Sequence, residues 1–268
     1  MYHEIYRPED HDRLKGLTNP VYNTEINVFR KQMAYLHAKR IKTLTIDELF
    51  LKGSSIEGEE AVCLTFDDGW RGNYLHAYPV LQEYGLKATF FIATDLIGKS
   101  FYMTWEDIRE MAASGMSIQS HTVTHHPLAH MGGGRVLFEL SESKRVIEER
   151  LGQEVRHLSL PHGIKDERIW PLAKEIGYES ICTSDVGFQT WESNGPWIKR
   201  INIGDGTSEK KFRLIIQGKN RATWGMVATK NLKNMLRWSI GINNYQKLYR
   251  LIYSKKMKIK EHSAAPPI

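Results

Sequence analysis

Residues 61–69 read Ala-Val-Cys-Leu-Thr-Phe-Asp-Asp-Gly, an apolar run that ends in two adjacent carboxylates. The run predicts a buried strand, and Asp67 and Asp68 stand where that strand gives way to a loop. Farther along, the strand-like run Met116–Ser120 is followed by His121-Thr-Val-Thr-His125. Catalytic groups of a parallel barrel gather at the carboxyl ends of its strands. The two segments therefore predict a catalytic centre at one edge of a parallel sheet.

Together these segments offer two carboxylates and two imidazoles, which is the ligand set of a divalent metal with one carboxylate left over as a base. An Asp/His/His site leaves a coordination position open for water, unlike a closed structural site. The side chains of Asp67 and Asp68 must diverge, so we expect one to bind the metal and the other to accept a proton. His121 and His125 face one side if their segment begins a helical turn. Asp-Asp-Gly alone would equally describe a surface turn, but the strand before it and the spaced histidines favour a metal-dependent hydrolase.

Apolar and amphipathic runs alternate along the chain. Predicted strands cover residues 1–5, 61–66, 88–93, 116–120, 157–160, 180–183 and 198–203; predicted helices cover 25–39, 72–84, 104–114, 135–151 and 166–176, with a last one near 230–256. Thr104 is an expected N-cap, and the expected helix stops are Gly85, Gly115, Gly152 and Gly177. This alternation predicts parallel strands joined by crossover helices. About seven such units fit a distorted, incomplete (β/α)7-type barrel that forms a single catalytic domain.

The chain has 268 residues and two cysteines, Cys63 and Cys182, each inside an apolar run. A chain of this length buries a full core without disulfides, so we expect reduced and packed thiols. The sequence shows no secretory signal and no apolar run long enough to cross a bilayer. These features predict a cytoplasmic protein, unless its native start is missing.

The net charge of +6 is unevenly distributed. Residues 210–260 hold fourteen Lys or Arg and no Asp or Glu. In residues 230–260 the cations interleave with apolar and aromatic residues, as in a helix that lies on an anionic membrane surface. A helix packed on the barrel with a solvated basic rim is an equal alternative, and no nucleic-acid partner is expected. We therefore predict a barrel over 1–229, a basic amphipathic segment over 230–260 and a disordered tail over 261–268.

Thr65-Phe-Asp-Asp-Gly69 and His121-Thr-x-x-His125 resemble the first two motifs of the polysaccharide deacetylase family, also called the NodB-homology or carbohydrate esterase family 4 domain. The resemblance extends over roughly residues 1–205, and Pro161-His-Gly163 stands in the family's third motif. The opening Met1-Tyr-His-Glu-Ile5 resembles the first strand of a permuted branch that includes poly-N-acetylglucosamine deacetylases.

The resemblance implies that Asp67 is the general base, that Asp68, His121 and His125 bind the metal, and that the backbone N–H of His162 stabilises an oxyanion. Zinc is the favoured metal, although such a site also accepts cobalt or manganese. In two places this chain departs from the family. Ser159 stands where the family commonly has an arginine that orients the base, so that support is missing or comes from elsewhere. Residues 199–206 also lack the histidine that supplies the general acid. An early histidine replaces it in the permuted branch, which makes His3 the predicted acid and His162 its rival.

The resemblance implies removal of acetyl groups from an acetylated polysaccharide or glycolipid-linked sugar, in exopolysaccharide or envelope biosynthesis. Two alternatives stay open: a catalytically weak barrel that binds carbohydrate or acts as a scaffold, and a hydrolase of another non-peptide C–N bond. Aromatic side chains often stack on sugars, and the candidate platforms are Trp70, Trp105, Trp191 and Trp197. For each of these tryptophans, packing is the first interpretation. The sequence leaves open which polymer is used, and whether an N- or an O-acetyl group is removed.

Overall fold

The computed structural model describes residues 1–15, 17–52, 61–189 and 195–229. The chain divides into two compact units, Met1–Lys219 and Asn220–Ile268. The first unit contains all the described strands, and the described part of the second begins with the 3-10 helix η6 (Asn220–Ala222). The predicted basic segment and tail lie outside the described residues, so the domain boundary expected after residue 229 stays a prediction. Within the described residues, no helix combines the length and apolarity that a membrane span needs.

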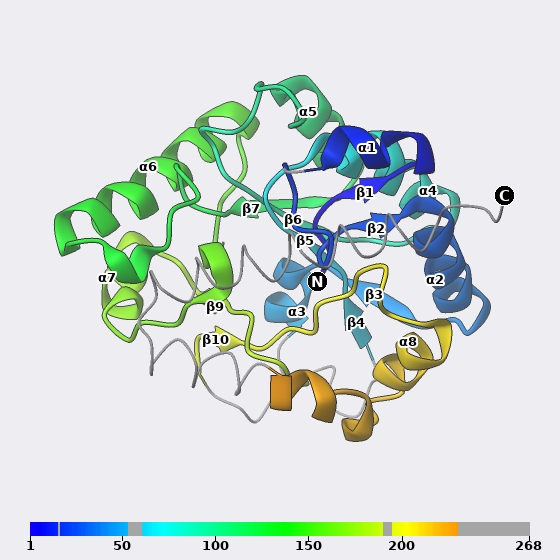
Figure 1. Ribbon diagram of the computed structural model, residues 1–268. Coiled ribbons are helices and arrows are strands. Elements are labelled where there is room, and N and C mark those ends of the chain that lie inside the picture. Colours follow the sequence, from blue (N-terminus) through cyan, green and yellow to red (C-terminus); the bar gives the residue numbers. More distant parts are fainter. Residues whose placement is uncertain (16, 53–60, 190–194, 230–268) are drawn as a thin grey trace, which may run out of the picture. The chain divides into compact units, whose positions relative to one another are not determined.

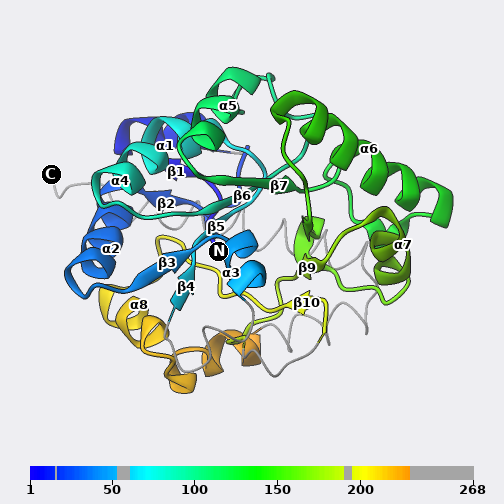
Figure 2. The ribbon, with the colours of Figure 1, turned by 180° about the vertical axis from the view of Figure 1, so that it is seen from behind.

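Six parallel strands form the main sheet of the first unit, in the order β10-β9-β8-β7-β6-β5. Their bounds are β5 (Thr65–Phe66), β6 (Thr89–Ile92), β7 (Ser117–Ser120), β8 (His157–Ser159), β9 (Ser180–Cys182) and β10 (Trp197–Ile198). Helices alternate with them: α4 (Tyr78–Glu83), α5 (Trp105–Ala113), α6 (Gly133–Leu151) and α7 (Ile169–Ile176). Figures 1 and 2 show these helices outside a curled sheet. The predicted incomplete barrel is confirmed.

The N-terminal residues lie between the first and last strands of the sheet. Tyr2 forms an isolated parallel bridge with Phe66, and the N–H of Ile203 donates to the carbonyl of Met1 at 2.9 Å. Closure of the sheet into a barrel requires this neighbour relation. The predicted strand over 1–5 is nevertheless wrong in extent. The strand β1 (Ile5–Tyr6) pairs with β2 (Thr24–Glu25), away from the main sheet.

The predicted strand over 61–66 is interrupted at Leu64. Its first part, β4 (Ala61–Cys63), pairs with β3 (Lys42–Leu44), whereas β5 pairs with β6. Between β3 and β4 lies a helix that periodicity missed, α3 (Ile46–Lys52). Both ribbon views place α3 between strands β5–β7 and strands β9–β10. Its Ile46 packs against core residues of those strands: Phe91, Cys182 and Ile198.

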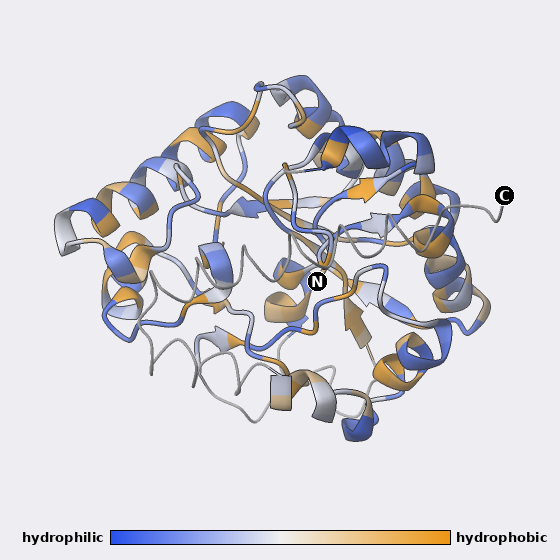
Figure 3. Ribbon diagram, viewed as in Figure 1, coloured by the Kyte–Doolittle hydropathy of each residue, from blue (hydrophilic) through white to orange (hydrophobic). Residues whose placement is uncertain are grey.

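The remaining helices are η1 (Pro8–Asp10), α1 (His11–Leu14), α2 (Ile26–Ala38), the π-helix η3 (Asn73–Ala77), η4 (Leu128–His130), η5 (Pro161–Gly163) and α8 (Glu209–Ile216). The expected helix ends are confirmed: Thr104 caps α5 in a capping box with Asp107, and Gly152 and Gly177 end α6 and α7 in the left-handed conformation. Figure 3 shows hydrophobic and hydrophilic residues alternating along α6, as in a helix with one buried face. Both cysteines are free, as predicted.

Candidate active site

The three predicted metal ligands converge beyond the carboxyl ends of β5 and β7. Oδ1 of Asp68 lies 3.2 Å from Nε2 of His121 and 3.0 Å from Nε2 of His125. These ligand atoms all lie within 4.8 Å of one another, and in the part of the chain that the structure describes this is the only such group. Asp68 and His121 are nearly enclosed, whereas 26% of the His125 side chain is exposed. One side of the group is therefore accessible.

Neighbouring groups orient two of these ligands. Nδ1 of His121 lies 2.7 Å from the carbonyl oxygen of Ser159, and because a carbonyl only accepts, Nδ1 must carry the proton. Nε2 is then left unprotonated, which is the form that binds a metal. Oδ2 of Asp68 accepts a hydrogen bond from the indole of Trp70 at 2.9 Å, while Oδ1 faces the imidazoles. One carboxylate and two imidazoles in this arrangement fit a catalytic divalent metal, with zinc among the candidates.

Asp67 contacts a different set of residues, and its main partner is Arg200. The guanidinium binds both carboxylate oxygens, Nη1 to Oδ1 at 2.7 Å and Nη2 to Oδ2 at 2.8 Å. Nη2 also donates to the hydroxyl of Ser159 at 2.8 Å, and that hydroxyl donates to Asp67 at 3.1 Å. All three residues are buried. The adjacent aspartates therefore have separate partners, as two separate roles require.

The electrostatics of the two aspartates follow from these partners. Burial would raise the pKa of Asp67, but the charge of Arg200, its hydrogen bonds and the charges of His121 and His3 together lower that pKa to about 2. Burial would likewise raise the pKa of Asp68, and the imidazoles of His121 and His125 beside its carboxylate hold it well below its ordinary value. Both carboxylates are consequently ionised near neutral pH, despite their adjacency.

Arg200 accounts for the departure at Ser159 that the sequence left unexplained. The arginine comes from the segment after β10, and Nε donates to the carbonyl of Thr183 at 3.0 Å, which anchors the guanidinium at the end of β9. Ser159 remains as a bridge between Arg200 and Asp67. Sequence reasoning missed Arg200 because its only signal was one basic residue after a short apolar run, in a chain with 37 Lys and Arg.

The backbone around the ligands adopts conformations that are rare for residues with a side chain. Six described non-glycine residues have positive φ, and four of them lie at the site: Asp68 at 77°, Thr122 at 69°, His125 at 60° and His162 at 59°. Each such conformation costs about 1–3 kcal/mol, and they cluster where a structure holds functional groups in place. The expected helical turn at His121–His125 is wrong, because the segment is a bent loop. The two rings still lie only 4.8 Å apart.

Glu139 of α6 supports this loop. Oε2 accepts hydrogen bonds from the backbone N–H groups of Val123 at 3.0 Å and Thr124 at 2.9 Å. Oε1 accepts from the hydroxyl of Thr124 at 2.8 Å and from Arg135 at 2.9 Å. Glu139 is fully buried. Its carboxylate thus satisfies donors that a helix would have paired internally.

His3 lies close enough to the two aspartates to respond to their charges. Burial lowers the pKa of His3 below 6.5, and the charges of Asp68 and Asp67 partly offset that effect. Nδ1 is buried and has no hydrogen-bond partner among the described residues. The ring lies against that of Tyr22, with centroids 4.6 Å apart. The structure brings His3 to the site, and its role as acid stays a prediction.

The other candidate residues have different surroundings. His162 is exposed, and its ring lies 5.3 Å from that of His125. His126 is exposed. Trp70 is buried and stacks on Tyr102 with centroids 4.6 Å apart, so it packs and orients Asp68 instead of offering a platform. The guanidinium of Arg150 lies over Trp105 at 5.6 Å and the ammonium of Lys165 over Trp197 at 4.7 Å. Trp191 lies outside the described residues.

Comparisons with known proteins agree with this architecture. Residues 55–181 match the family described as polysaccharide deacetylase. YxkH of Bacillus subtilis (strain 168) is 33% identical over 191 residues, which cover 70% of this chain and 68% of YxkH. The poly-beta-1,6-N-acetyl-D-glucosamine N-deacetylase of Staphylococcus aureus (strain MRSA252) is 24% identical over 203 residues, 70% of each chain. The Streptococcus pyogenes deacetylase PplD, solved in complex with acetate, has a TM-score of 0.72 and 26% identity, and the match covers 82% of this chain and 96% of PplD.

A curled parallel sheet with a pair of carboxylates and two histidines at its carboxyl edge defines a hydrolase of the carbohydrate esterase type. The chain belongs to the polysaccharide deacetylase family. It is accordingly an enzyme that removes acetyl groups from acetylated polysaccharide.

Proposed function

We propose that this protein is a metal-dependent deacetylase of an N-acetylated hexosamine polymer, acting in exopolysaccharide or envelope biosynthesis. The observation that carries the proposal is the convergence of Asp68, His121 and His125 beside an ionised Asp67 that Arg200 holds separately. The choice of polymer is supported by the likeness to the poly-beta-1,6-N-acetyl-D-glucosamine N-deacetylase of S. aureus.

In the proposed mechanism Asp68, His121 and His125 hold the metal. A divalent metal at such a site supplies Lewis-acid polarisation of the acetyl carbonyl and makes water a better nucleophile near neutral pH. Asp67, ionised and oriented by Arg200, accepts the proton of the attacking water. The backbone N–H of His162 donates a hydrogen bond to the oxygen of the carbonyl as negative charge develops on it.

His3 is the proposed donor of the proton that the leaving amine needs. Burial lowers its pKa, which makes the imidazolium a stronger acid, and the nearby charges of Asp68 and Asp67 help to sustain the protonated form. His3 does not belong to the group of converging ligand atoms. His162 is the rival, since its ring lies next to His125.

Acetate release from an N-acetylglucosamine oligomer by the metal-loaded protein tests the proposed reaction. We expect release by the wild type and loss of release on chelation. Asp68→Ala should lose both metal and activity, whereas Asp67→Asn should keep the metal and lose activity. Full metal occupancy in Asp68→Ala would contradict the ligand assignment.

The acid is tested separately with His3→Ala and, as the matched control, His162→Ala, which keeps its backbone N–H. Loss of general acid catalysis should lower the kcat of His3→Ala by about two to four orders of magnitude, with metal content unchanged. A normal kcat in His3→Ala together with a large loss in His162→Ala would move the role to His162.

A barrel that binds carbohydrate without turnover is the main alternative, and its motives were the missing arginine and the displaced acid. Arg200 removes the first of these motives, because it binds the carboxylate of Asp67 through both oxygens.

We also propose that the basic segment 230–260 attaches the enzyme to an anionic membrane surface. Truncation after residue 229 should leave turnover of a small acetyl ester intact and reduce sedimentation with anionic liposomes at low salt.

A further inference from the structure

An exposed aromatic ring lies directly beside the proposed acid. Tyr22 is 38% exposed, and its ring meets that of His3 at a centroid distance of 4.6 Å and an interplanar angle of 38°. Two further apolar side chains of the same loop (residues 17–23, the Tyr22 loop) are exposed, Leu17 at 48% and Val21 at 44%. Water therefore reaches an apolar surface next to the catalytic residues, where a substrate must also lie.

The Tyr22 loop is held in place by the segment that follows β10. The carbonyl of Val21 accepts a hydrogen bond from the side chain of Asn202 at 3.4 Å, and that of Asn23 accepts from the N–H of Asp205 at 2.9 Å. Gly204 makes the close approach possible, because a Cβ there would lie 2.3 Å from the carbonyl oxygen of Val21. Tyr22 is thus presented by an ordered loop, as a preorganised binding surface requires.

The indole that contacts Asp68 is not accessible to a sugar. Trp70 is buried, donates to Asp68 and stacks on Tyr102. Tyr22 is exposed and its ring contacts that of His3. An accessible aromatic surface therefore lies beside the proposed proton donor.

We propose that Tyr22 is a stacking platform for a sugar ring, and that the Tyr22 loop forms a binding subsite for the acetylated hexosamine chain. The C–H face of a pyranose is apolar, and aromatic rings stack on such surfaces. A sugar on Tyr22 lies beside His3, so the subsite positions the leaving nitrogen near its proton donor. This inference rests on the proposed function, since it names a subsite of the same site.

A positioning role for Tyr22 makes a different prediction. If Tyr22 only orients the imidazole of His3, its loss lowers kcat for an N-acetylglucosamine oligomer, whose leaving amine needs a proton, and leaves KM for that oligomer unchanged. A sugar subsite instead raises KM for an oligomer and leaves a small ester such as 4-nitrophenyl acetate unaffected, because the ester has no sugar to stack. The split between kcat and KM on these two substrates separates the two roles.

The experiment compares Tyr22→Ala with Tyr22→Phe, which keeps the ring, and with Leu51→Ala, an exposed apolar residue of α3 outside the loop. For Tyr22→Ala we expect KM for an N-acetylglucosamine oligomer to rise about three- to tenfold, the usual worth of an aromatic stacking contact. Turnover of 4-nitrophenyl acetate should be unchanged, and the two control variants should behave like the wild type. An unchanged KM for the oligomer, with or without a fall in its kcat, overturns the proposal.

A binding measurement keeps this test independent of turnover. A glucosamine oligomer, which has no acetyl group to lose, is titrated into the metal-loaded wild type and into Tyr22→Ala by calorimetry. We expect Kd to rise about three- to tenfold in the variant. If that rise is seen while the wild type releases no acetate, the proposed function fails and the subsite stands. Equal Kd values, or no binding to the wild type, overturn the subsite.

Discussion

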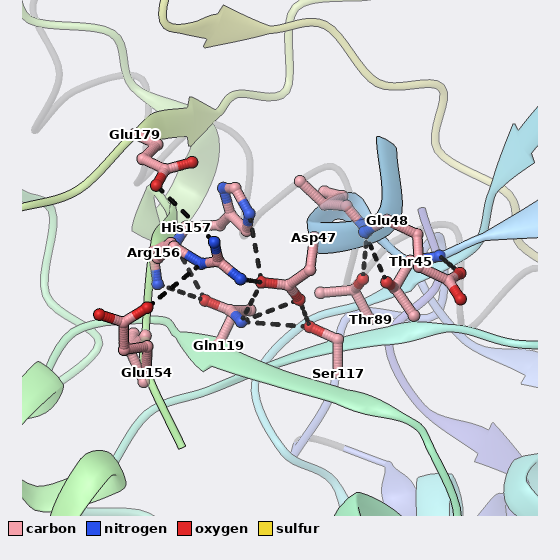
Figure 4. Close-up of polar contacts among 12 residues, drawn as sticks. Thr45, Asp47, Glu48, Thr89, Ser117, Gln119, Glu154, Arg156, His157 and Glu179 are labelled. Carbon is pink, nitrogen blue, oxygen red and sulfur yellow. Dashed lines mark hydrogen bonds and ion pairs between the residues drawn. The ribbon is translucent and has the colours of Figure 1, made fainter. Parts of the chain in front are cut away.

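Two aspartates, Asp67 buried and Asp47 partly buried, lie near opposite ends of strands β7 and β8, and they are bound in different ways. At the carboxyl ends, the two Nη atoms of Arg200 donate hydrogen bonds to both carboxylate oxygens of Asp67, at 2.7 and 2.8 Å. At the amino ends, Asp47 of α3 lies 3.7 Å from Arg156 and 3.4 Å from His157, as Figure 4 shows. Each cluster contains an aspartate, an arginine, a histidine and a serine within reach. The difference between them therefore lies in geometry and not in composition.

The Asp47 cluster spreads its charge over many partners. Asp47 accepts hydrogen bonds from Ser117 and from Gln119 (Figure 4), the latter at 3.1 and 3.3 Å. The amide oxygen of Gln119 in turn accepts from the backbone N–H groups of Arg156 and His157 at 3.0 and 2.9 Å. These contacts tie α3 to β7 and β8, and polar residues at the amino end of a barrel commonly serve stability.

The Asp67 region differs also in its backbone. Asp68, Thr122, His125 and His162 have positive φ, whereas no residue of the Asp47 cluster does. A buried carboxylate near an arginine and a histidine is therefore not in itself a sign of catalysis. The functional end is marked by a bidentate partner and by strained backbone that the surrounding contacts hold in place.

The largest effect is expected from Arg200→Lys. Lysine keeps the charge but cannot bind both oxygens of Asp67, so the base loses its orientation. We expect kcat/KM to fall about 100-fold, the usual cost of a misplaced catalytic group. Arg156→Lys, at the other end, is the matched control and should leave kcat/KM unchanged. Steady-state deacetylation, with metal content measured in parallel, tests both variants. Equal losses of kcat/KM in the two variants would contradict a catalytic role specific to the Asp67 end of the strands.

Asp47→Asn should affect stability and leave catalysis unchanged. The amide has one acceptor atom. With its oxygen in the place of Oδ2 it still accepts from Ser117 and Gln119, but its amino group then faces Arg156 and His157. We expect the free energy of unfolding to fall by about 1–3 kcal/mol, the range for an unsatisfied buried polar group. Urea denaturation measures this loss, and kcat should stay at the wild-type value. A large fall in kcat with normal stability would show that α3 acts on the active site.

The barrel and four of the polar residues at its edge were accessible to sequence reasoning because their signals are local. Asp67 and Asp68 follow an apolar run directly, and His121 and His125 share one short segment. Arg200 was not accessible, because it meets Asp67 across 133 positions of the chain. The helix α3 was missed since seven residues are too few for a clear amphipathic period.

Glu139→Gln should weaken metal binding by a smaller factor. Glu139 accepts hydrogen bonds through both oxygens, from the loop that carries His121 and His125, and the amide group would turn one acceptor into a donor. Residues behind metal ligands typically contribute about 10–100-fold to affinity. Because the loop keeps its other contacts, we expect a loss of about tenfold, measured by competition with a chromogenic chelator. Glu142→Gln, on the exposed side of the same helix, should bind metal normally.

The smallest expected effect is the pH dependence of the contribution that Asp47 makes to stability. Burial raises the pKa of Asp47, but the nearby imidazole of His157, the hydrogen bond from Ser117 and the charge of Arg156 together outweigh it, so the folded-state pKa lies below the ordinary value. A group whose pKa is depressed by folding stabilises the protein above its unfolded-state pKa, about 3.9 for aspartate, and loses that contribution as pH falls through the folded-state value.

The difference in unfolding free energy between wild type and Asp47→Asn should therefore stay constant from about pH 7 to pH 5 and shrink below about pH 4. Urea denaturation of both proteins across this range measures the difference directly, and subtraction removes the titration of carboxylates that the two proteins share. A difference that persists undiminished at pH 3 would mean that the hydrogen bonds of Asp47 matter and its charge does not. The Asp47 cluster would then stabilise the barrel through its hydrogen bonds alone, in contrast to the ion pair between Arg200 and Asp67 at the catalytic end.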